Sequence, residues 1–383
     1  MELKDICQYV SEKVATTTLT KENYISTENM LPDKGGIVIA SGVPFGNSTA
    51  FSVGDVLVSN IRPYFRKIWL ANRNGGCSAD VLCFRANSNV DNSYFYYLLS
   101  QQEFFDYIMS GAKGCKMPRG DKRQIMQWKV ELPPLDEQRH IASVLSSLDS
   151  KIELNHRING NLEQQAQALF KAWFVDFEPF KDGKFVDSEL GKIPAGWKVV
   201  ELGKVTTQEK EKVGIRSDVK VLSPVTTGKL MLSEEYFTKQ VFSDSIAKYI
   251  LVKPNSFAYN PARVNIGSMG RNTFMFDGCV SPVYVVFSCE KEYHYFFDMY
   301  RQLPSFKEEV IARSIGGVRQ TLKYSDFALI RIVYPPQNIV LKFNDLYKRL
   351  LHAQDMYHTE SENLTEIRDL LLPRLMSGEI KMQ

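Results

Sequence analysis

The second half of this chain repeats the first half at a nearly constant separation. Cys77, in the apolar segment CSADVLCF, corresponds to Cys279 in CVSPVYVVF, 202 residues later. The pair Pro133-Pro134 corresponds to Pro335-Pro336 at the same separation. Closer to the N-terminus the separation decreases by a few residues, which small loop insertions explain. A repeat of this length predicts two copies of one structural unit.

Length and composition agree with two globular domains. A chain of 383 residues exceeds the roughly 250 to 300 residues that one hydrophobic core usually supports. It is 44% hydrophobic and 24% charged, and it has no window near the roughly 18 unbroken apolar residues of a membrane span. Residues 1–10 lack the basic start and apolar core of a signal peptide. We therefore expect a cytoplasmic protein that does not enter a membrane.

Each copy begins with a globular region and ends with a long helix. Short β-branched and aromatic segments, separated by Gly, Pro and Asn, predict a mixed α/β globule. A Pro-Pro pair then ends the extended backbone. The next segment, residues 135–177, contains no proline and a single glycine, Gly160. This composition favours one continuous helix. Its apolar residues alternate in steps of four and three, as in a coiled coil.

The second copy keeps this heptad pattern less regularly, and Pro373 is expected to kink or end its helix. An apolar seam of this length needs a partner, and the other helix is the nearest one. Antiparallel pairing would hold the two globules apart. The predicted seam comprises Ile141, Leu145, Leu148, Ile152, Leu162, Leu169, Trp173, Leu350, Leu364 and Leu371. Asn155 and Asn159 interrupt it, and they either fix the register or face solvent at a break near Gly160.

The predicted fold is therefore α+β: two tandem mixed α/β domains separated by two long helices that form an antiparallel coiled coil, with a pseudo-twofold internal repeat. Residues 1–132 form the first globule and 133–177 the first helix. Residues 178–192, a charged segment with two glycines, are predicted to be a linker. Residues 193–334 form the second globule, and 335–383 contain the second helix.

The sequence favours neither a metal site nor a catalytic centre. The six cysteines include no C-x-x-C pair and the five histidines no H-E-x-x-H, so we expect reduced thiols and no metal. A methyltransferase motif is approached only at Asn260-Pro261-Ala262-Arg263, which lacks the second proline and the aromatic ring, and no G-x-G-x-x-G occurs. Glu2-Leu3-Lys4 resembles part of a nuclease motif but has no upstream Pro-Asp. We predict a chain without catalytic activity.

Several motifs together resemble one protein family. They are PPLDEQRHIASVLSSLDSKIELN after the first globule, LFKAWFVDF at the end of the first helix, and GKIPAGWKVVELG before the second globule. YPP at 334–336 and LLPRLMSGEI near the C-terminus complete the set. With the tandem arrangement, these motifs resemble the specificity subunits of type I restriction-modification enzymes over essentially the whole chain.

The resemblance implies that residues 1–132 and 193–334 are target-recognition domains, each reading one half of a bipartite double-stranded DNA target. It also implies that partner modification (methyltransferase) and restriction (endonuclease/translocase) subunits carry out adenine methylation and restriction. S-adenosylmethionine, ATP and magnesium would then bind to those partners, and no cofactor to this chain. Residues 336–340 depart from the family pattern, because they lack the L-x-E-Q sequence found at 135–138. This departure leaves the start of the second helix open.

Candidate DNA contacts come from segments rich in cations and free of carboxylates. The net charge of +3 alone says little, but residues 56–79, 107–120, 245–276 and 310–325 contain no Asp or Glu. Arg, Lys, Asn and Gln in these segments can reach phosphates or base edges. The predicted contacts are Asn60, Arg62, Arg66, Lys67, Lys113, Lys116, Arg119, Asn260, Arg263, Arg271, Arg313, Arg319, Gln320 and Lys323.

Two alternatives remain open at this point. Any one of these cations can be an ordinary solvated surface charge. The whole chain can also be a coiled-coil scaffold that binds protein clients without reading DNA. A salt series of DNA binding distinguishes the two functions, because phosphate contacts produce a steep salt dependence.

Overall fold

The computed structural model describes residues 1–237, 239–314 and 321–380. Contacts divide the chain into two compact units, one made of Met1–Ile158 with Met356–Gln383 and the other of Asn159–Asp355. Each unit therefore contains one globule and part of both long helices. No helix among the described residues is long and apolar enough to cross a membrane.

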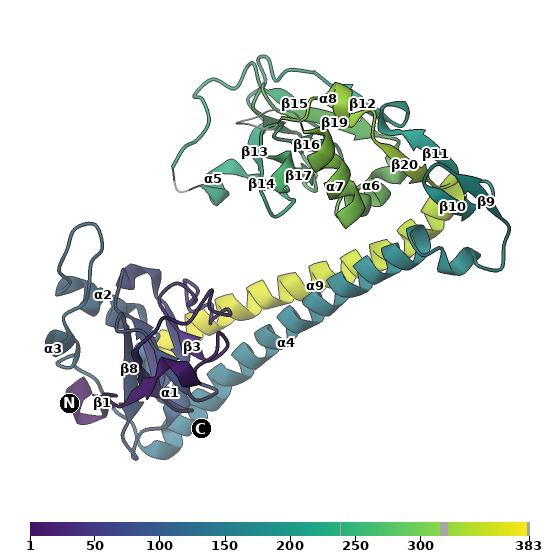
Figure 1. The fold of residues 1–383 in the computed structure, drawn as a ribbon. Helices are drawn as coiled ribbons and strands as arrows, with labels where there is room; N and C mark the ends of the chain where they lie inside the picture. The colour runs from purple at the N-terminus through teal and green to yellow at the C-terminus, as the bar shows by residue number, and fades with distance from the viewer. Residues whose placement is uncertain (238, 315–320, 381–383) are drawn as a thin grey trace. The chain divides into compact units, whose positions relative to one another are not determined.

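The globule of the first unit contains two four-stranded sheets (Figure 1). The first has the order β1-β8-β5-β6, formed by Cys7–Tyr9, Val81–Ala86, Val56–Ser59 and Ile68–Leu70. The second has the order β2-β4-β7-β3, formed by Lys13–Ala15, Asn47–Phe51, Gly75–Cys77 and Tyr24–Ile25. Strand β5 is buried throughout because its side chains alternate between two hydrophobic clusters. Val56 and Val58 pack into one cluster, and Leu57 packs into the other.

Three helices complete this globule: α1 (Asn92–Leu99), α2 (Gln102–Ser110) and α3 (Lys122–Ile125). The Asp91 carboxylate accepts hydrogen bonds from the backbone N–H groups of Ser93 and Tyr94, which caps α1. Helices α1 and α2 supply Tyr94 and Phe104 to the same hydrophobic cluster as Val56 and Val58. The first sheet and its helices thus share one core.

The second unit also contains two four-stranded sheets, and its first sheet repeats the strand order of the first unit while its second sheet differs. Its first sheet has the order β12-β19-β16-β17, formed by Thr206–Glu209, Val285–Cys289, Phe257–Tyr259 and Met269–Arg271. Its second has the order β14-β13-β18-β15, formed by Leu230–Leu232, Lys220–Pro224, Gly278–Val280 and Ile250–Val252. The helices are α5 (Ser233–Tyr236), α6 (His294–Tyr300), α7 (Pro304–Arg313) and α8 (Tyr324–Phe327). A further pair joins β11 (Lys198–Glu201) to β20 (Arg331–Tyr334).

The repeat is visible in strand pairing as well as in sequence. Each unit has a parallel pair in its second sheet: β3 with β7, where Ile25 lies opposite Cys77, and β13 with β18, where Val221 lies opposite Cys279. The two cysteines that mark the repeat in the sequence therefore occupy corresponding strands. Both are fully buried thiols, and burial raises the pKa of each to about 12.

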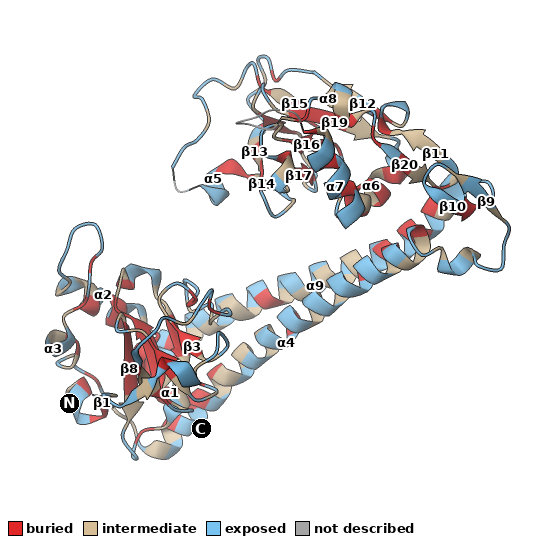
Figure 2. Cartoon of the chain, viewed as in Figure 1, coloured by how far each residue is buried: buried red, intermediate tan, exposed pale blue. Residues whose placement is uncertain are grey.

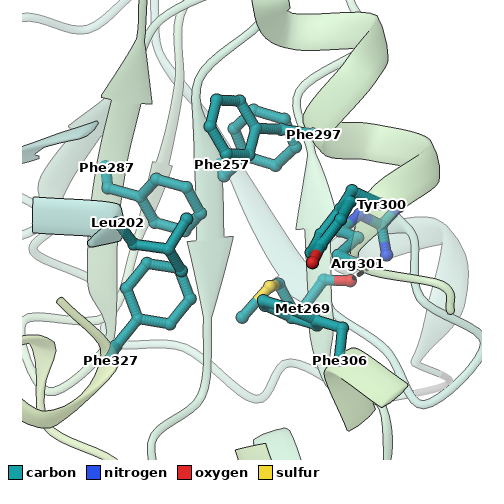
Figure 3. A pocket seen from close by; sticks show the side chains of 9 residues that line it. All are labelled: Leu202, Phe257, Met269, Phe287, Phe297, Tyr300, Arg301, Phe306 and Phe327. Carbon is teal, nitrogen blue, oxygen red and sulfur yellow. Dashed lines mark hydrogen bonds between the residues drawn. The ribbon is translucent and has the colours of Figure 1, made fainter. Parts of the chain in front are cut away.

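The core of the second unit is closely packed. Figure 3 shows aromatic and aliphatic side chains, including Phe257, Phe287 and Phe327, around a cavity of about 10 Å³. The Arg301 guanidinium lies at its edge and donates a hydrogen bond to the Met269 carbonyl at 2.8 Å. Because so small a space can hold at most one water molecule, this cavity is a packing defect and not a ligand site.

The segment 178–192 contains regular structure in place of a plain linker. Strands β9 (Phe185–Ser188) and β10 (Gly191–Pro194) form an antiparallel hairpin. Phe177 and Phe180 precede the hairpin, and each ring centroid lies 5.3 Å from that of Trp197. The charged composition that favoured a linker reflects the solvent exposure of the hairpin, since only Ile193 and Pro194 of its strands are buried.

Two 40-residue helices, α4 (Leu135–Phe174) and α9 (Gln337–Met376), pair in an antiparallel manner within each unit. In the first unit Asp149 contacts Arg368, and Asn155 contacts Glu360. In the second unit the ring of Phe170 lies 5.7 Å from that of Phe343. Buried or half-buried positions alternate with exposed ones along both helices (Figure 2), as a coiled-coil seam requires. Every predicted seam residue is buried or half-buried.

At its start the second helix settles a point that the sequence left open, and at its end it does not stop at Pro373. It begins at Gln337, directly after the Pro-Pro pair, although the L-x-E-Q sequence is missing. Pro373 does not end it, because the helix continues to Met376. Gly378 follows in the left-handed conformation, with φ of 72°, and its N–H donates to the Leu375 carbonyl. Glycine beyond the last turn is the usual helix stop, and it sets the end here.

Candidate nucleic-acid interface

A hollow in the second unit is lined by four lysines: Lys210, Lys212, Lys248 and Lys323. All four side chains are exposed, and none forms an ion pair with any residue that the structure describes. Pro261, Tyr284 and Tyr324 form part of the wall, which contains no carboxylate of a described residue. The hollow is therefore a concentrated positive surface whose ammonium groups have no carboxylate partner in the described part of the chain.

Local backbone geometry explains why these lysines lie together. Residues 208–212 continue strand β12 in an extended form, so alternate side chains point to opposite sides. Lys210 and Lys212 line the hollow. Glu209 instead accepts a hydrogen bond from the Ser288 hydroxyl, and Glu211 forms an ion pair with Lys253 at 2.8 Å. The intervening glutamates thus leave the two lysines free.

The first unit brings together two of the predicted segments. The Arg62 N–H donates to the Pro118 carbonyl at 2.8 Å, and Ile61 forms a β-bridge with Arg119. Arg62 forms no ion pair within the described residues, and its Nε is buried there without a hydrogen-bond partner. The Asn60 side-chain oxygen beside it is also buried and unpartnered among those residues. This turn thus holds polar groups whose hydrogen bonding is incomplete.

Several predicted contacts have internal partners. Arg66 binds Asp33, Lys67 donates to the Thr27 carbonyl, and Arg313 pairs with Glu309. Two others are held only at the surface: Lys113 pairs with Asp121 at 3.3 Å, and Arg119 with Asp80 at 3.0 Å. Exposed pairs contribute at most about 1 kcal/mol, so a phosphate can replace these two carboxylates at little cost.

Arg271 is a correction to the predicted set. Only 8% of the residue is exposed, and its guanidinium donates to Asp298 at 2.8 Å and lies against the Tyr295 ring. A buried, neutralised arginine cannot reach DNA. The prediction was wrong because the carboxylate that binds Arg271 is 27 residues away, outside the acid-free segment.

The remaining predicted residues have varied surroundings. Arg263 and Lys116 are exposed and form no ion pair within the described part of the chain. The Asn260 side-chain oxygen accepts the Ala262 N–H at 3.0 Å and so stabilises the turn. Arg319 and Gln320 lie outside the described residues.

Three lysines of the hollow, Lys210, Lys212 and Lys248, were absent from the predicted set, although Lys248 lies in the acid-free segment 245–276. Lys210 and Lys212 lie outside the acid-free segments because each is next to a glutamate in the sequence. A search with strand periodicity would have found them, because Gln208, Lys210 and Lys212 share one face.

No group of three or more His, Cys, Asp or Glu side chains suited to a metal ion occurs among the described residues. The six cysteines are free thiols, and five are buried or half-buried. Burial raises the pKa of Cys7 and Cys289 to about 12, so these thiols stay protonated at neutral pH.

Known proteins resemble this chain over most of its length. A family model for the type I restriction modification DNA specificity domain matches residues 1–164. The MjaIX specificity subunit of Methanocaldococcus jannaschii is 30% identical over 310 residues, covering 77% of this chain and 70% of the relative. The HindI specificity subunit of Haemophilus influenzae is 26% identical across 99% of this chain and 98% of its own.

The fold has a solved counterpart. The crystal structure of a type I restriction-modification S subunit from M. genitalium superimposes with a TM-score of 0.58 at 16% identity, covering 100% of this chain and 96% of that one. Sequence and fold thus agree with the motifs found in the sequence. This chain belongs to the family of type I restriction enzyme specificity subunits, and the domain matched in it is a DNA-specificity domain, not a catalytic one.

Proposed function

We propose that this chain reads a bipartite double-stranded DNA target, with one half read by each globule. The observation that carries this proposal furthest is the lysine-lined hollow of the second unit. Four ammonium groups without carboxylate partners among the described residues are suited to the closely spaced phosphates of duplex DNA. Phosphate contacts of this kind set position and orientation, while base edges supply the sequence information.

Base reading in the first unit fits the turn at Arg62, whose side chain is half-buried, whereas Asn60 is only 8% exposed and supports the turn from within. Arg62 forms no ion pair within the described residues, so the exposed part of its guanidinium keeps hydrogen-bond donors for a base edge or a phosphate. Arginine pairs with guanine and asparagine with adenine in the major groove. The neighbouring loop at 113–119 supplies Lys113, Lys116 and Arg119 for phosphates.

The partners in this proposal are modification and restriction subunits of a type I complex. Those subunits would carry out adenine methylation and DNA cleavage, and they would bind S-adenosylmethionine, ATP and magnesium. Family membership and the lysine-lined hollow favour DNA reading over a protein-interaction scaffold.

Salt dependence tests the proposal directly. The full chain, with modification subunits, is titrated against mixed-sequence duplex DNA at several salt concentrations. Each phosphate contact contributes about 0.9 to the slope of log affinity against log salt. The double variant Lys210→Gln/Lys212→Gln should therefore lower the slope by about 2.

A matched control removes the same charge elsewhere. Lys192 and Lys198 are exposed in the second unit and do not line the hollow. The variant Lys192→Gln/Lys198→Gln should leave the slope unchanged. Equal losses in the two variants would show that only net charge matters, and a wild-type chain without DNA binding would contradict the proposed function.

A further inference from the structure

Backbone strain is concentrated at one place in the first unit. Six non-glycine residues of the described chain have positive φ, and four of them lie together: Asp33 (53°), Lys34 (61°), Arg62 (50°) and Arg66 (49°). The left-handed conformation is unfavourable for residues with a Cβ atom, so other contacts must hold it. Two of the four residues, Arg62 and Arg66, flank the turn Pro63–Phe65.

Backbone hydrogen bonds join the two strained segments. The Asp33 N–H donates to the Phe65 carbonyl at 2.8 Å, and the Lys34 N–H donates to the Arg66 carbonyl at 3.0 Å. The Asp33 carboxylate also accepts a hydrogen bond from Arg66 Nε at 3.0 Å. The loop at 33–34 and the turn at 62–66 therefore form one strained assembly, which includes the Arg62 main chain.

One ion pair attaches this assembly to the C-terminal part of α9. Lys34 Nζ lies 2.9 Å from Asp369 Oδ1, and the Lys34 side chain is only 8% exposed. Asp369 is fixed in turn by Arg368, whose guanidinium also binds Asp149 of α4 at 2.7 Å. The Asp149 carboxylate accepts a further hydrogen bond from the Tyr97 hydroxyl at 2.6 Å. Lys34 is thus buried against a carboxylate that the helix pair holds in place.

We propose that Lys34 and Asp369 are positioning residues for DNA reading in the first unit: α9 holds the strained basic turn at 62–66 through this ion pair. The inference rests on the proposed function, because it assigns a role in reading to a contact that touches no DNA. The helix pair then does more than connect the globules, since its C-terminal end also determines the conformation of a recognition turn. Losing the ion pair would relax the turn without unfolding the core.

Hydrogen exchange on the full chain tests the structural half of this inference without DNA. In Lys34→Met the side chain stays unbranched but loses its charge and the terminal ammonium group. We expect the Asp33, Lys34 and Arg66 amides to exchange at least about tenfold faster, while core amides such as Val58 keep their rates. The conservative variant Lys34→Arg should restore protection. Unchanged exchange at the three amides in Lys34→Met would overturn the inference, whatever the function.

Sequence selection from a randomised duplex library tests the functional half, with the full chain and its modification subunits. Lys34→Met and Asp369→Asn should lower discrimination in one half of the selected target by about threefold to tenfold and leave the other half unchanged. The control Glu360→Gln breaks another ion pair of the helix pair, with Lys151, and should change neither half.

The outcomes separate the two claims. Two unaltered halves in Lys34→Met would overturn the positioning role and leave the proposed function standing. Equal loss in both halves would overturn the role too, because it would indicate general destabilisation. If the wild type selects no sequence, both the proposed function and the positioning role fail.

Discussion

Asp298 is a buried carboxylate neutralised by two arginines. Arg271 donates to one of its oxygens at 2.8 Å, and Arg301 donates to the other at 2.6 Å. Burial alone would raise the pKa of Asp298, but the two guanidinium groups outweigh it and hold the pKa below its usual value. The protonation of Asp298 therefore makes the stability of the second unit's core depend on pH.

The sign of the pH effect follows from that shift. With a folded pKa below the unfolded value of about 4, the unfolded chain binds more protons in this range, so stability falls as the pH drops through the folded pKa. Asp298→Asn should cost about 3 kcal/mol or more at pH 7, because two buried cations lose their partner. It should also make the free energy of unfolding depend less on pH below pH 4.

Urea unfolding between pH 3 and 7 measures both the loss of stability and its pH dependence, with the exposed Asp345→Asn as control. An equal pH dependence in wild type and Asp298→Asn would contradict the argument.

At Gly160 a substitution is expected to stabilise the protein. It lies inside α4, and a Cβ atom built there has no neighbour within 4 Å. Gly160→Ala should therefore stabilise the protein by about 1 kcal/mol, because alanine loses less backbone entropy in a helix. Thermal unfolding measures the change. Gly76→Ala is the contrasting variant, since its Cβ would lie 2.5 Å from Leu19 Cδ1 and 2.9 Å from Val14 Cγ1, and it should destabilise. A lower melting temperature in Gly160→Ala would show that the helix needs flexibility there.

At the scale of elements, the helix pair contains a polar layer. Asn155 is fully buried, and its amide donates to Glu360 Oε2 at 2.8 Å, while Lys151 pairs with the same carboxylate at 3.1 Å. The Asn155 side-chain oxygen has no partner among the described residues. Of the two alternatives for Asn155, solvent exposure near Gly160 is therefore excluded. A buried seam asparagine fixes register at a cost in stability.

The polar layer is expected to lower the stability of the helix pair while favouring one helix pairing over others. Asn155→Leu removes the unsatisfied oxygen and should raise the free energy of unfolding by about 1 kcal/mol. It should also permit other helix pairings, seen as additional species in size-exclusion chromatography with light scattering. A lower melting temperature would show that the hydrogen bond to Glu360 outweighs the unsatisfied oxygen.

At the scale of the whole molecule, the two globules share the strand order of their first sheets, whereas their second sheets and their side chains differ. The first sheets have matching orders, β1-β8-β5-β6 and β12-β19-β16-β17, but the basic hollow of the second unit has a different lining from the turn at Arg62 in the first. One framework with two sets of side chains predicts an asymmetric target.

Single substitutions should therefore affect one half of that target. Arg62→Gln in the first unit should relax one half-site by about 1 to 3 kcal/mol of discrimination, and Arg263→Gln in the second unit should relax only the other. Methylation mapping of host genomes that carry each variant measures both halves at once. If either variant altered both halves, independent reading by the two globules would be contradicted.

The sequence alone determined the framework. The 202-residue repeat, the heptad seam from Ile141 to Trp173 and the Pro-Pro pairs are local or periodic signals, and local signals fix where helices and strands form. The same signals failed at helix and linker ends. Gly378 and not Pro373 ends α9, and aromatic contacts with Trp197 accompany the hairpin at 185–194.

Only the tertiary structure decided which cations are available for DNA. Arg271 and Lys248 lie in the same acid-free segment, yet one is buried against Asp298 and the other lines an exposed hollow. Lys210 and Lys212 lie beside glutamates in sequence and away from them in space. The reason is physical. A cation is neutralised by a carboxylate within about 4 Å, and folding brings together carboxylates and cations that are far apart in the sequence.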